Sequence, residues 1–302
     1  MSFGWLSLAG AVSVVALAAL VRGRLYAIFA SVLLTIHTLV SVALWPAFAW
    51  AWPVYAYLQA TVYVHFASLA WARLRPRPYR LLVSVPASFF VAGTFLAFPW
   101  AIAVAFGFEP HGAWVPFVVA AVGLLQSISH RPEEIDITVD GAPVASLRRH
   151  PRGAERVERP LRLVQITDPH LGPFMSERRL RALAERAVAQ DPDLVLLTGD
   201  FVTMESHDAE DALARALAPL QALPGRVFAC RGNHDHEAPR MVARALEAVG
   251  ARLLIDEAVL VETPFGAVDI LGLDFHFRGR NEKIAAACRR HPRTEGAFRL
   301  VL

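Results

Sequence analysis

The sequence has 302 residues, a length that is enough for two units of ordinary domain size. Hydrophobic residues make up 55% of it and charged residues only 19%, a balance that argues against a wholly soluble protein. The formal net charge of +3 is carried almost entirely by arginines beside the apolar stretches, which favours contact with lipid headgroups over binding of nucleic acid.

Residues 1–130 are almost uncharged and contain five apolar runs, at residues 3–21, 25–45, 47–72, 81–108 and 114–128. A helix needs about 20 apolar residues to cross a bilayer, so the fifth run is short. Because the backbone finds no water to bond with in lipid, such runs must be helical. We therefore predict a transmembrane helical domain over residues 1–130 with four to five spans. No basic residue precedes the first run, which argues against a cleaved signal peptide.

The arginines between the runs predict the orientation of the helices. They fall in two loops, with Arg22 and Arg24 in one and Arg73, Arg75, Arg77 and Arg80 in the other. Loops rich in arginine stay in the cytoplasm, so the N-terminus is expected to face outward. With five spans the second domain is cytoplasmic, and with four it lies outside. We predict a multi-pass membrane protein whose second domain is cytoplasmic.

Four residues that could carry chemistry receive a structural interpretation. His37 and His65 lie inside predicted spans, where a histidine either marks a proton or substrate path or bonds to a neighbouring helix as a neutral ring. No acidic residue lies within any span, which favours the second alternative. Cys230 and Cys288 are too few for a disulfide framework and are predicted to be buried reduced thiols.

From residue 133 onward, strand patterns and helix patterns alternate. Strands are predicted at 161–168, 193–200 and 225–230, helices at 176–190, 209–223 and 238–250, a hairpin at 258–275, a helix at 282–290 and a strand at 297–302. Alternation of this kind predicts an α/β domain with parallel central strands, here residues 131–302. The basic segment 144–162 is either a solvated linker or a stretch that lies on anionic headgroups.

Polar side chains follow three of these strands at the point where each strand ends. Asp168 and His170 follow the first strand, Asp200 the second, and Asn233 with His234 the third. Because ligands bind beyond the carboxyl ends of parallel strands, these side chains are expected to meet at one edge of the sheet. Asp168 and His170 are two apart, so an extended backbone would point both the same way. Carboxylate, imidazole and amide donors together predict a site for Mn, Fe or Zn.

The motifs "DPH", "GD" and "GNHD" resemble those of the calcineurin-like metallophosphoesterases, in the branch whose catalytic domain follows membrane helices. The resemblance covers roughly residues 134–302 and departs from the usual pattern at Pro169, where an aliphatic residue is more common. It implies a four-layer α/β/β/α sandwich after an N-terminal all-α transmembrane bundle. It also implies an active site with two divalent metal ions. In the family, such a site hydrolyses phosphoesters or pyrophosphates, including lipid-linked ones.

The resemblance also implies the role of each site residue. Asp168 and His170 would bind the first metal ion, Asp200 would bridge both ions, and Asn233 would bind the second through its amide oxygen. His234 would not be a ligand but would face the substrate and assist the leaving group as an acid. Asp235 could orient His234, and no separate cofactor site is expected.

The family supplies further histidine ligands after a strand like the one at 297–302, and residues 131–302 contain no match for them. We therefore expect an incomplete sandwich that lacks its C-terminal part, and a 302-residue chain that binds metal poorly and is weakly active or inactive. His276 follows a hairpin strand and is not expected to substitute. Metal content compared with that of an extended chain tests this expectation.

The sequence thus predicts a membrane-anchored, metal-dependent phosphoric ester hydrolase whose partners are membrane lipids and a phosphorylated small-molecule or lipid-linked substrate, with no nucleic acid. The alternative is a non-catalytic membrane protein with a degenerate or truncated phosphoesterase domain. A channel or carrier is disfavoured because the spans lack paired charges. Neither the natural substrate nor the oligomeric state follows from the residues.

Overall fold

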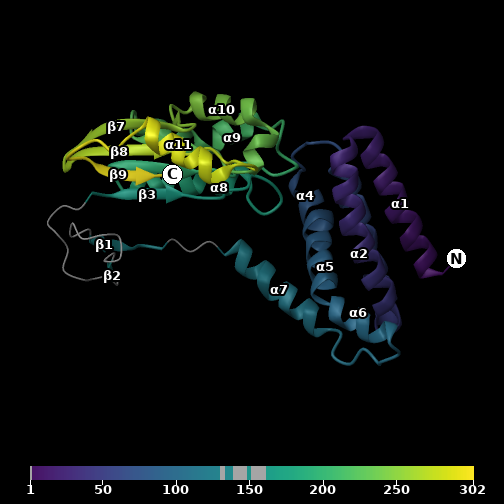
Figure 1. The fold of residues 1–302 in the computed structure, drawn as a ribbon. Helices are drawn as coiled ribbons and strands as arrows, with labels where there is room; N and C mark the ends of the chain where they lie inside the picture. The colour runs from purple at the N-terminus through teal and green to yellow at the C-terminus, as the bar shows by residue number, and fades with distance from the viewer. Residues whose placement is uncertain (1, 130–132, 139–147, 151–160) are drawn as a thin grey trace.

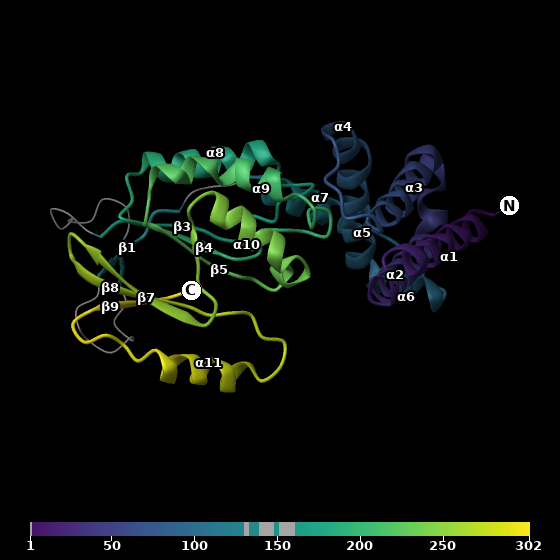
Figure 2. The same ribbon diagram turned by 90° about the horizontal axis from the view of Figure 1, so that it is seen from above.

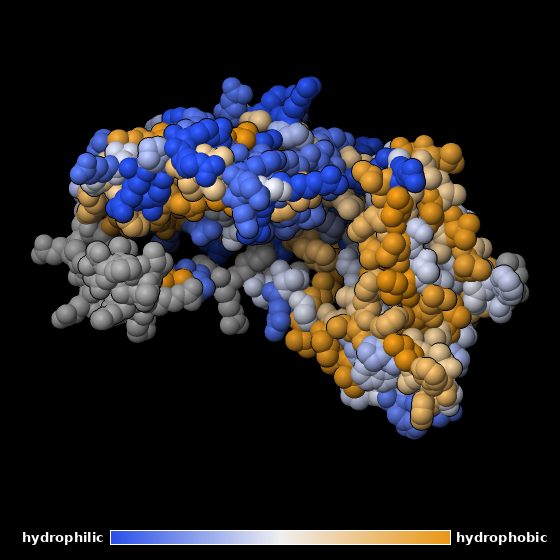
Figure 3. Space-filling model, in the orientation of Figure 1, coloured by the Kyte–Doolittle hydropathy of each residue, from blue (hydrophilic) through white to orange (hydrophobic). Residues whose placement is uncertain are grey.

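A computed structural model describes residues 2–129, 133–138, 148–150 and 161–302. The chain forms a helical bundle and an α/β domain, which lie at the right and the upper left of Figure 1. The face of the bundle seen in Figure 3 is mostly hydrophobic, whereas that of the α/β domain is mostly hydrophilic. The predicted basic segment 144–162 falls largely outside the described residues. Within it, β2 (Arg148–His150) pairs antiparallel with β1 (Asp136–Thr138).

The described part of the bundle is built from apolar helices joined by short turns. They are α1 (Phe3–Val21), α2 (Arg24–Phe48), the 3-10 turn η1 (Ala49–Ala51), α3 (Trp52–Ser68), α4 (Arg77–Tyr79), the π-helical turn η2 (Arg80–Ser84), α5 (Val85–Leu96), α6 (Phe98–Ala105) and α7 (Val115–Ile128). By length and composition, the described helical segments able to cross a membrane are Phe3–Val21, Arg24–Ser68 and Arg77–Leu96. The predicted apolar helices are therefore present.

The longest of these segments, Arg24–Ser68, contains two helices that run antiparallel. The Tyr26 hydroxyl near its start donates a hydrogen bond of 2.7 Å to the Phe66 carbonyl near its end. Ser41 and Gln59, which lie on either side of the turn η1, are joined by a bond of 2.6 Å. The segment therefore folds back at η1, and α2 and α3 lie side by side as two separate helices.

The predicted single run over 81–108 is wrong, because the helix breaks at Ala97. The helix α5 ends at Leu96 and α6 begins at Phe98. Pro99, which has no backbone N–H, would clash with the carbonyl of Phe95 if the helix continued. The chain then returns along α5 through α7, whose Phe117 ring lies 5.8 Å from the ring of Phe90.

His37 is fully buried inside the bundle, and its Nδ1 lies 2.8 Å from Oγ1 of Thr94 on α5. Bonding to a neighbouring helix, the interpretation that the sequence favoured, is confirmed for this histidine. His65 differs, because an acidic side chain from the other domain lies beside it, as described below.

The α/β domain begins with a parallel sheet in the order β3-β4-β5-β6. Its strands and the helices between them are β3 (Leu163–Ile166), α8 (Glu177–Ala189), β4 (Leu194–Thr198), α9 (Glu210–Leu217) with the 3-10 turn η4 (Ala218–Ala222), β5 (Val227–Cys230), the 3-10 turn η5 (His234–Glu237), α10 (Pro239–Ala248) and β6 (Arg252–Leu253). The Ser176 hydroxyl accepts the N–H of Arg179 and caps α8. Pro239 opens α10, and Gly250 follows its end at φ +72°.

A second sheet packs on the first. It contains the antiparallel pair β7 (Glu257–Thr263) and β8 (Gly266–Gly272), with β9 (Phe298–Val301) parallel to β8. Alternate residues of β4 face opposite ways: Leu194 and Leu196 join the cluster between the sheets, and Val195 and Leu197 join the core under the helices. Figure 2 shows α8, α9 and α10 on one side and α11 (Arg280–Arg290) on the other. The predicted α/β/β/α layering is confirmed.

The two cysteines are free, as predicted, but only one of them is buried. Cys230 lies in the buried strand β5, whereas Cys288 is exposed. The prediction is wrong for Cys288 because α11 is an outer layer that buries only Ala287.

Candidate metal centre

Loops at the carboxyl ends of β3, β4 and β5 bring the predicted donor side chains together. Nε2 of His170 lies 3.5 Å from Oδ2 of Asp200 and 4.0 Å from Oδ1 of Asp168. The rings of His170 and His234 face each other edge-on at 5.1 Å. One donor atom from each of His170, Asp200 and His234 lies within 4.8 Å of the others. The predicted meeting at one sheet edge therefore holds for these four side chains.

Asn233, the remaining predicted ligand, directly precedes η5 and is half-buried. It has helical backbone angles, φ −67° and ψ −34°, and its chain neighbour His234 belongs to the donor group. The residue thus lies at the same edge of the sheet, and its role as a ligand stays a prediction.

The backbone at three of these residues is left-handed. The φ angles are +47° at Asp168, +44° at His170 and +54° at Asp200. The expectation that an extended backbone aligns Asp168 with His170 is wrong: a tight turn brings them together instead. Left-handed residues other than glycine are uncommon, and they persist where the surrounding structure enforces them, often at functional sites.

Glycines allow the second and third loops to touch. Gly199 has φ +78°, and a Cβ there would lie 2.2 Å from the backbone nitrogen of Gly232. A Cβ on Gly232 would lie 2.1 Å from Oδ1 of Asp200. Any side chain at either position would force the loops apart, because real Cβ atoms do not approach so closely.

Asp235 holds the same two loops in register. It is fully buried, and its carboxylate accepts N–H bonds of 2.8–2.9 Å from Asp200, Phe201 and Gly232. Burial raises the pKa of Asp235, and the three backbone donors partly offset that effect. The sequence left open whether this residue orients the ring of His234. The structure shows instead that it fixes the backbone around the bridging candidate Asp200.

The donor set fits a divalent metal ion. Carboxylate oxygens and imidazole nitrogens converge, and Nδ1 of His234 is buried without a hydrogen-bond partner among the described residues. Such a mixture suits borderline transition metals better than Mg²⁺ or Ca²⁺, which take oxygen ligands alone.

Residues 161–274 match the family model of the calcineurin-like phosphoesterases. This match covers β3 to the end of β8 and includes every donor described above. Residues 161–274 are a calcineurin-like phosphoesterase domain.

Curated relatives of this phosphoesterase domain include a phosphodiesterase, a pyrophosphatase and a transmembrane protein with a metallophosphoesterase domain. Phosphodiesterase YaeI of Escherichia coli is 28% identical over 148 residues, which are 47% of this chain and 52% of that protein. The UDP-2,3-diacylglucosamine pyrophosphatase LpxG of Chlamydia muridarum is 36% identical over 76 residues, 25% of this chain and 23% of that protein. A transmembrane protein with a metallophosphoesterase domain from Danio rerio is 29% identical over 119 residues, 39% of this chain and 24% of that protein. The chain thus spans about half the length of the first relative and about a quarter of the others.

A second polar group in the phosphoesterase domain was not anticipated from the sequence. Asp274, which follows β8, lies 2.8 Å from Nη2 of Arg231 and 3.1 Å from Nε2 of His236. His276 lies 3.1 Å from Asp256, so its Nε2 already has a carboxylate partner. The signal that could have found Asp274 is its position, an acidic residue two positions after a buried strand.

Glu205, in the loop after β4, inserts its side chain against the bundle. It is 1% exposed, and neither carboxylate oxygen has a hydrogen-bond partner among the described residues. Its Oε1 lies 3.8 Å from Nδ1 of His65 on α3. The sequence favoured a neutral ring that bonds to a neighbouring helix, because no acid lies within a span. For His65, however, the acid comes from the phosphoesterase domain.

Burial of Glu205 makes the junction sensitive to pH. Burial raises the pKa of this carboxyl to about 7, and the charges of Arg75 and Arg80 partly offset the effect. Because the folded pKa lies above the unfolded one, the protonated form contributes stability that is present below the unfolded pKa of 4.5 and is lost as pH rises through about 7. The difference sets an upper limit of about 3 kcal/mol.

We expect Glu205→Gln to melt at a higher temperature than the unsubstituted protein at pH 8, with a difference that shrinks toward pH 5. The neutral amide removes the cost of a buried ionised carboxyl. Thermal melting at a series of pH values measures the difference. Glu295→Gln, at an exposed position, is the matched control and should show no such trend. A constant offset between Glu205→Gln and the unsubstituted protein would contradict the prediction.

Proposed function

We propose that the protein is a membrane-anchored, metal-dependent phosphoesterase that hydrolyses a phosphoester or pyrophosphate bond of a lipid-linked substrate. The metal centre holds two divalent ions, with Mn, Fe or Zn suited to its donors. Residues 1–130 are its membrane domain, with four to five passes, and residues 131–302 its catalytic domain.

The observation that carries the proposal is the direction in which the metal edge of the sheet faces. Arg80, at the start of η2, donates a bond of 3.2 Å to the carbonyl of Gly172, two residues after His170. Arg22, at the end of α1, reaches the carbonyl of Met204 at 3.4 Å, in the loop that follows Asp200. Arginines at helix ends lie at the level of the lipid headgroups. These contacts support a metal edge that faces the membrane surface, where a lipid headgroup is presented.

The relatives support the same substrate chemistry. The Chlamydia protein is named as a pyrophosphatase of a diacylated sugar nucleotide, and the Escherichia coli protein as a phosphodiesterase. Both names describe cleavage of a phosphorus–oxygen bond, and the first describes it on a substrate with acyl chains. A site that faces the bilayer suits such a substrate.

The site residues divide the work as follows. Asp168 and His170 would hold the first ion, Asp200 would be shared by both ions, and Asn233 would hold the second. When bound, the ions supply Lewis acidity and an acidified water. His234 donates a proton to the departing oxygen, while Asp235 keeps the backbone of Asp200 in place.

The same contacts support a cytoplasmic catalytic domain. The phosphoesterase domain touches the end of the bundle that carries Arg22 and Arg80, and arginine-rich helix ends stay in the cytoplasm.

Hydrolysis of bis(p-nitrophenyl) phosphate by the full-length gene product in detergent tests the proposal. We expect release of p-nitrophenol that depends on Mn²⁺, stops when EDTA removes the metal, and returns when Mn²⁺ is added back. A diacylated pyrophosphate in mixed micelles should be cleaved with a higher kcat/KM than the same headgroup without acyl chains.

Three results would contradict different parts of the proposal. Hydrolysis that survives EDTA would exclude the metal mechanism. A catalytically silent protein that still binds Mn²⁺ would favour the alternative, a non-catalytic membrane protein with a degenerate phosphoesterase domain. Equal kcat/KM with and without acyl chains would exclude the lipid-linked substrate alone.

A further inference from the structure

Arg22 joins the first membrane helix to two loops of the metal centre. It caps the C-terminus of α1, and its side chain is only 15% exposed. Nη1 donates to the carbonyl of Leu69, within the bundle, and reaches the Met204 carbonyl at 3.4 Å. Nη2 lies 3.3 Å from Nδ1 of His207 and 3.8 Å from Oε2 of Glu237. One guanidinium thus contacts the bundle and two separate loops of the phosphoesterase domain.

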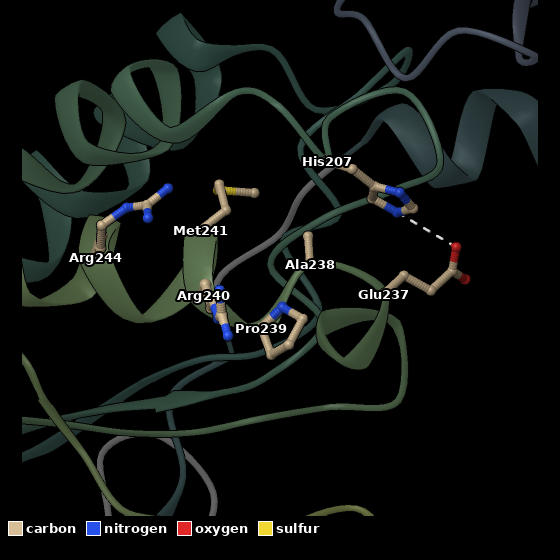
Figure 4. A pocket seen from close by; sticks show the side chains of 7 residues that line it. All are labelled: His207, Glu237, Ala238, Pro239, Arg240, Met241 and Arg244. Atoms are coloured by element: carbon tan, nitrogen blue, oxygen red, sulfur yellow. Dashed lines mark ion pairs between the residues drawn. The ribbon is translucent and has the colours of Figure 1, made fainter.

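These contacts lie close to the metal-binding candidates along the chain. Met204 and His207 belong to the loop that follows Asp200, and Glu237 ends the turn η5 that begins at His234. The two loops also touch each other, since Nε2 of His207 lies 3.5 Å from Oε2 of Glu237. Figure 4 shows this pair at the edge of a pocket of about 410 Å³ beside α10.

Only an arginine can make this set of contacts. Its planar fork presents several N–H donors in fixed directions, whereas a lysine offers one compact ammonium. The ring of Tyr26 lies 4.8 Å from the guanidinium carbon and supports it from the bundle side. Arg24, two residues away, is exposed, and its side chain makes no hydrogen bond or ion pair among the described residues. The two arginines therefore differ in structure although they contribute equally to membrane topology.

The other metal-bearing loop is also fastened to the bundle. Arg80 holds the carbonyl of Gly172 in the loop of Asp168 and His170. Glu205 packs its carboxyl against His65, five residues after Asp200. All three loops of the metal centre are thus tied to the membrane helices, and Arg22 serves two of them.

We infer that Arg22 is a positioning residue of the phosphoesterase reaction, which holds the loops of Asp200 and His234 in register while α1 is docked. The membrane bundle is then a structural part of the catalytic site and not only its anchor. This inference rests on the proposed function, because it assigns a role in that reaction. Arg22 itself contacts neither metal nor substrate.

Arg22→Gln in the full-length protein tests the inference. We expect kcat for bis(p-nitrophenyl) phosphate to fall about tenfold, within the range for residues that support metal ligands, while KM stays within about twofold. Hydrogen–deuterium exchange should become faster in residues 201–208 and 232–237 and remain unchanged in β4. Arg22→Lys should retain an intermediate kcat, since one ammonium cannot reach every acceptor. Arg24→Gln, which removes the same charge, should match the unsubstituted protein in both measurements.

A double-mutant cycle separates positioning from a general loss of stability. If Arg22 acts through His207, then Arg22→Gln and His207→Ala should be strongly non-additive in kcat, whereas Arg24→Gln and His207→Ala should add.

The inference is overturned if Arg22→Gln behaves as Arg24→Gln does in rate and exchange, or if it raises KM alone. If Arg22→Gln does not fold, Arg22→Lys decides, alone and in a cycle of its own with His207→Ala. Absence of Mn²⁺-dependent hydrolysis in the unsubstituted protein defeats the proposed function instead, and the exchange data still report whether Arg22 orders the loops.

Discussion

Asp200→Asn is expected to lower the rate of phosphodiester hydrolysis at least about 100-fold. Removing a residue that merely supports a metal ligand costs 10–100-fold, so removing the proposed bridging carboxylate should cost no less. Asp200 is 8% exposed, and its Oδ2 lies 3.5 Å from Nε2 of His170. Its Oδ1 accepts the backbone N–H of His234 at 2.9 Å. One carboxylate thus serves both the metal centre and the loop that carries the proposed acid.

The asparagine variant separates these two duties. Its amide oxygen can still accept the N–H of His234, so the loop should keep its place, while the charge and the second oxygen are lost. We expect the metal content measured by elemental analysis to fall while the melting temperature changes little. Asp208→Asn, at an exposed carboxyl in the same loop, is the matched control and should keep its rate and metal. If the variant retained a third or more of the rate, Asp200 would be excluded as a metal ligand.

The elements of the α/β domain follow from the sequence because their patterns are local. The strand β4 is a continuous apolar run buried on both faces, and α8 begins at a serine that caps it. The order of the metal-bearing loops also follows, since parallel strands must present their carboxyl ends on one edge. Asp168, His170, Asp200 and His234 meet there, as predicted.

The features that the sequence did not predict depend on contacts between distant residues. The left-handed turn at Asp168 and His170 is enforced by the loops around it, because His170 N–H bonds to the carbonyl of Asp200 and the next amide to that of Phe201. The partner of His65 is Glu205, which lies 140 positions away and belongs to the other domain. No periodicity in either segment encodes such a pairing. The role of Asp235 was not predicted for the same reason, because the backbone N–H groups of Asp200 and Phe201 that bond to its carboxylate come from another loop.

His234→Gln is expected to lower kcat about 100-fold for a diester with an alkyl leaving group, in the range typical of a lost general acid. The loss should be much smaller for a nitrophenyl ester, whose leaving group departs without a proton. The geometry leaves two roles for this ring. It belongs to the donor group of His170 and Asp200, within 4.8 Å, while the family resemblance makes it an acid and not a ligand. Dependence on the leaving group tells these roles apart.

An acid and a ligand predict different patterns for the same variant. If His234 donates a proton, then glutamine spares the metal content and slows the alkyl ester selectively. If it binds an ion, then metal content falls and both esters slow equally, because the water and the phosphoryl group lose the same ion. His291→Gln, remote from the metal edge at the end of α11, controls for the substitution itself. Equal losses on both esters would therefore reassign His234 to the metal centre, where its buried and unpaired Nδ1 would find its partner.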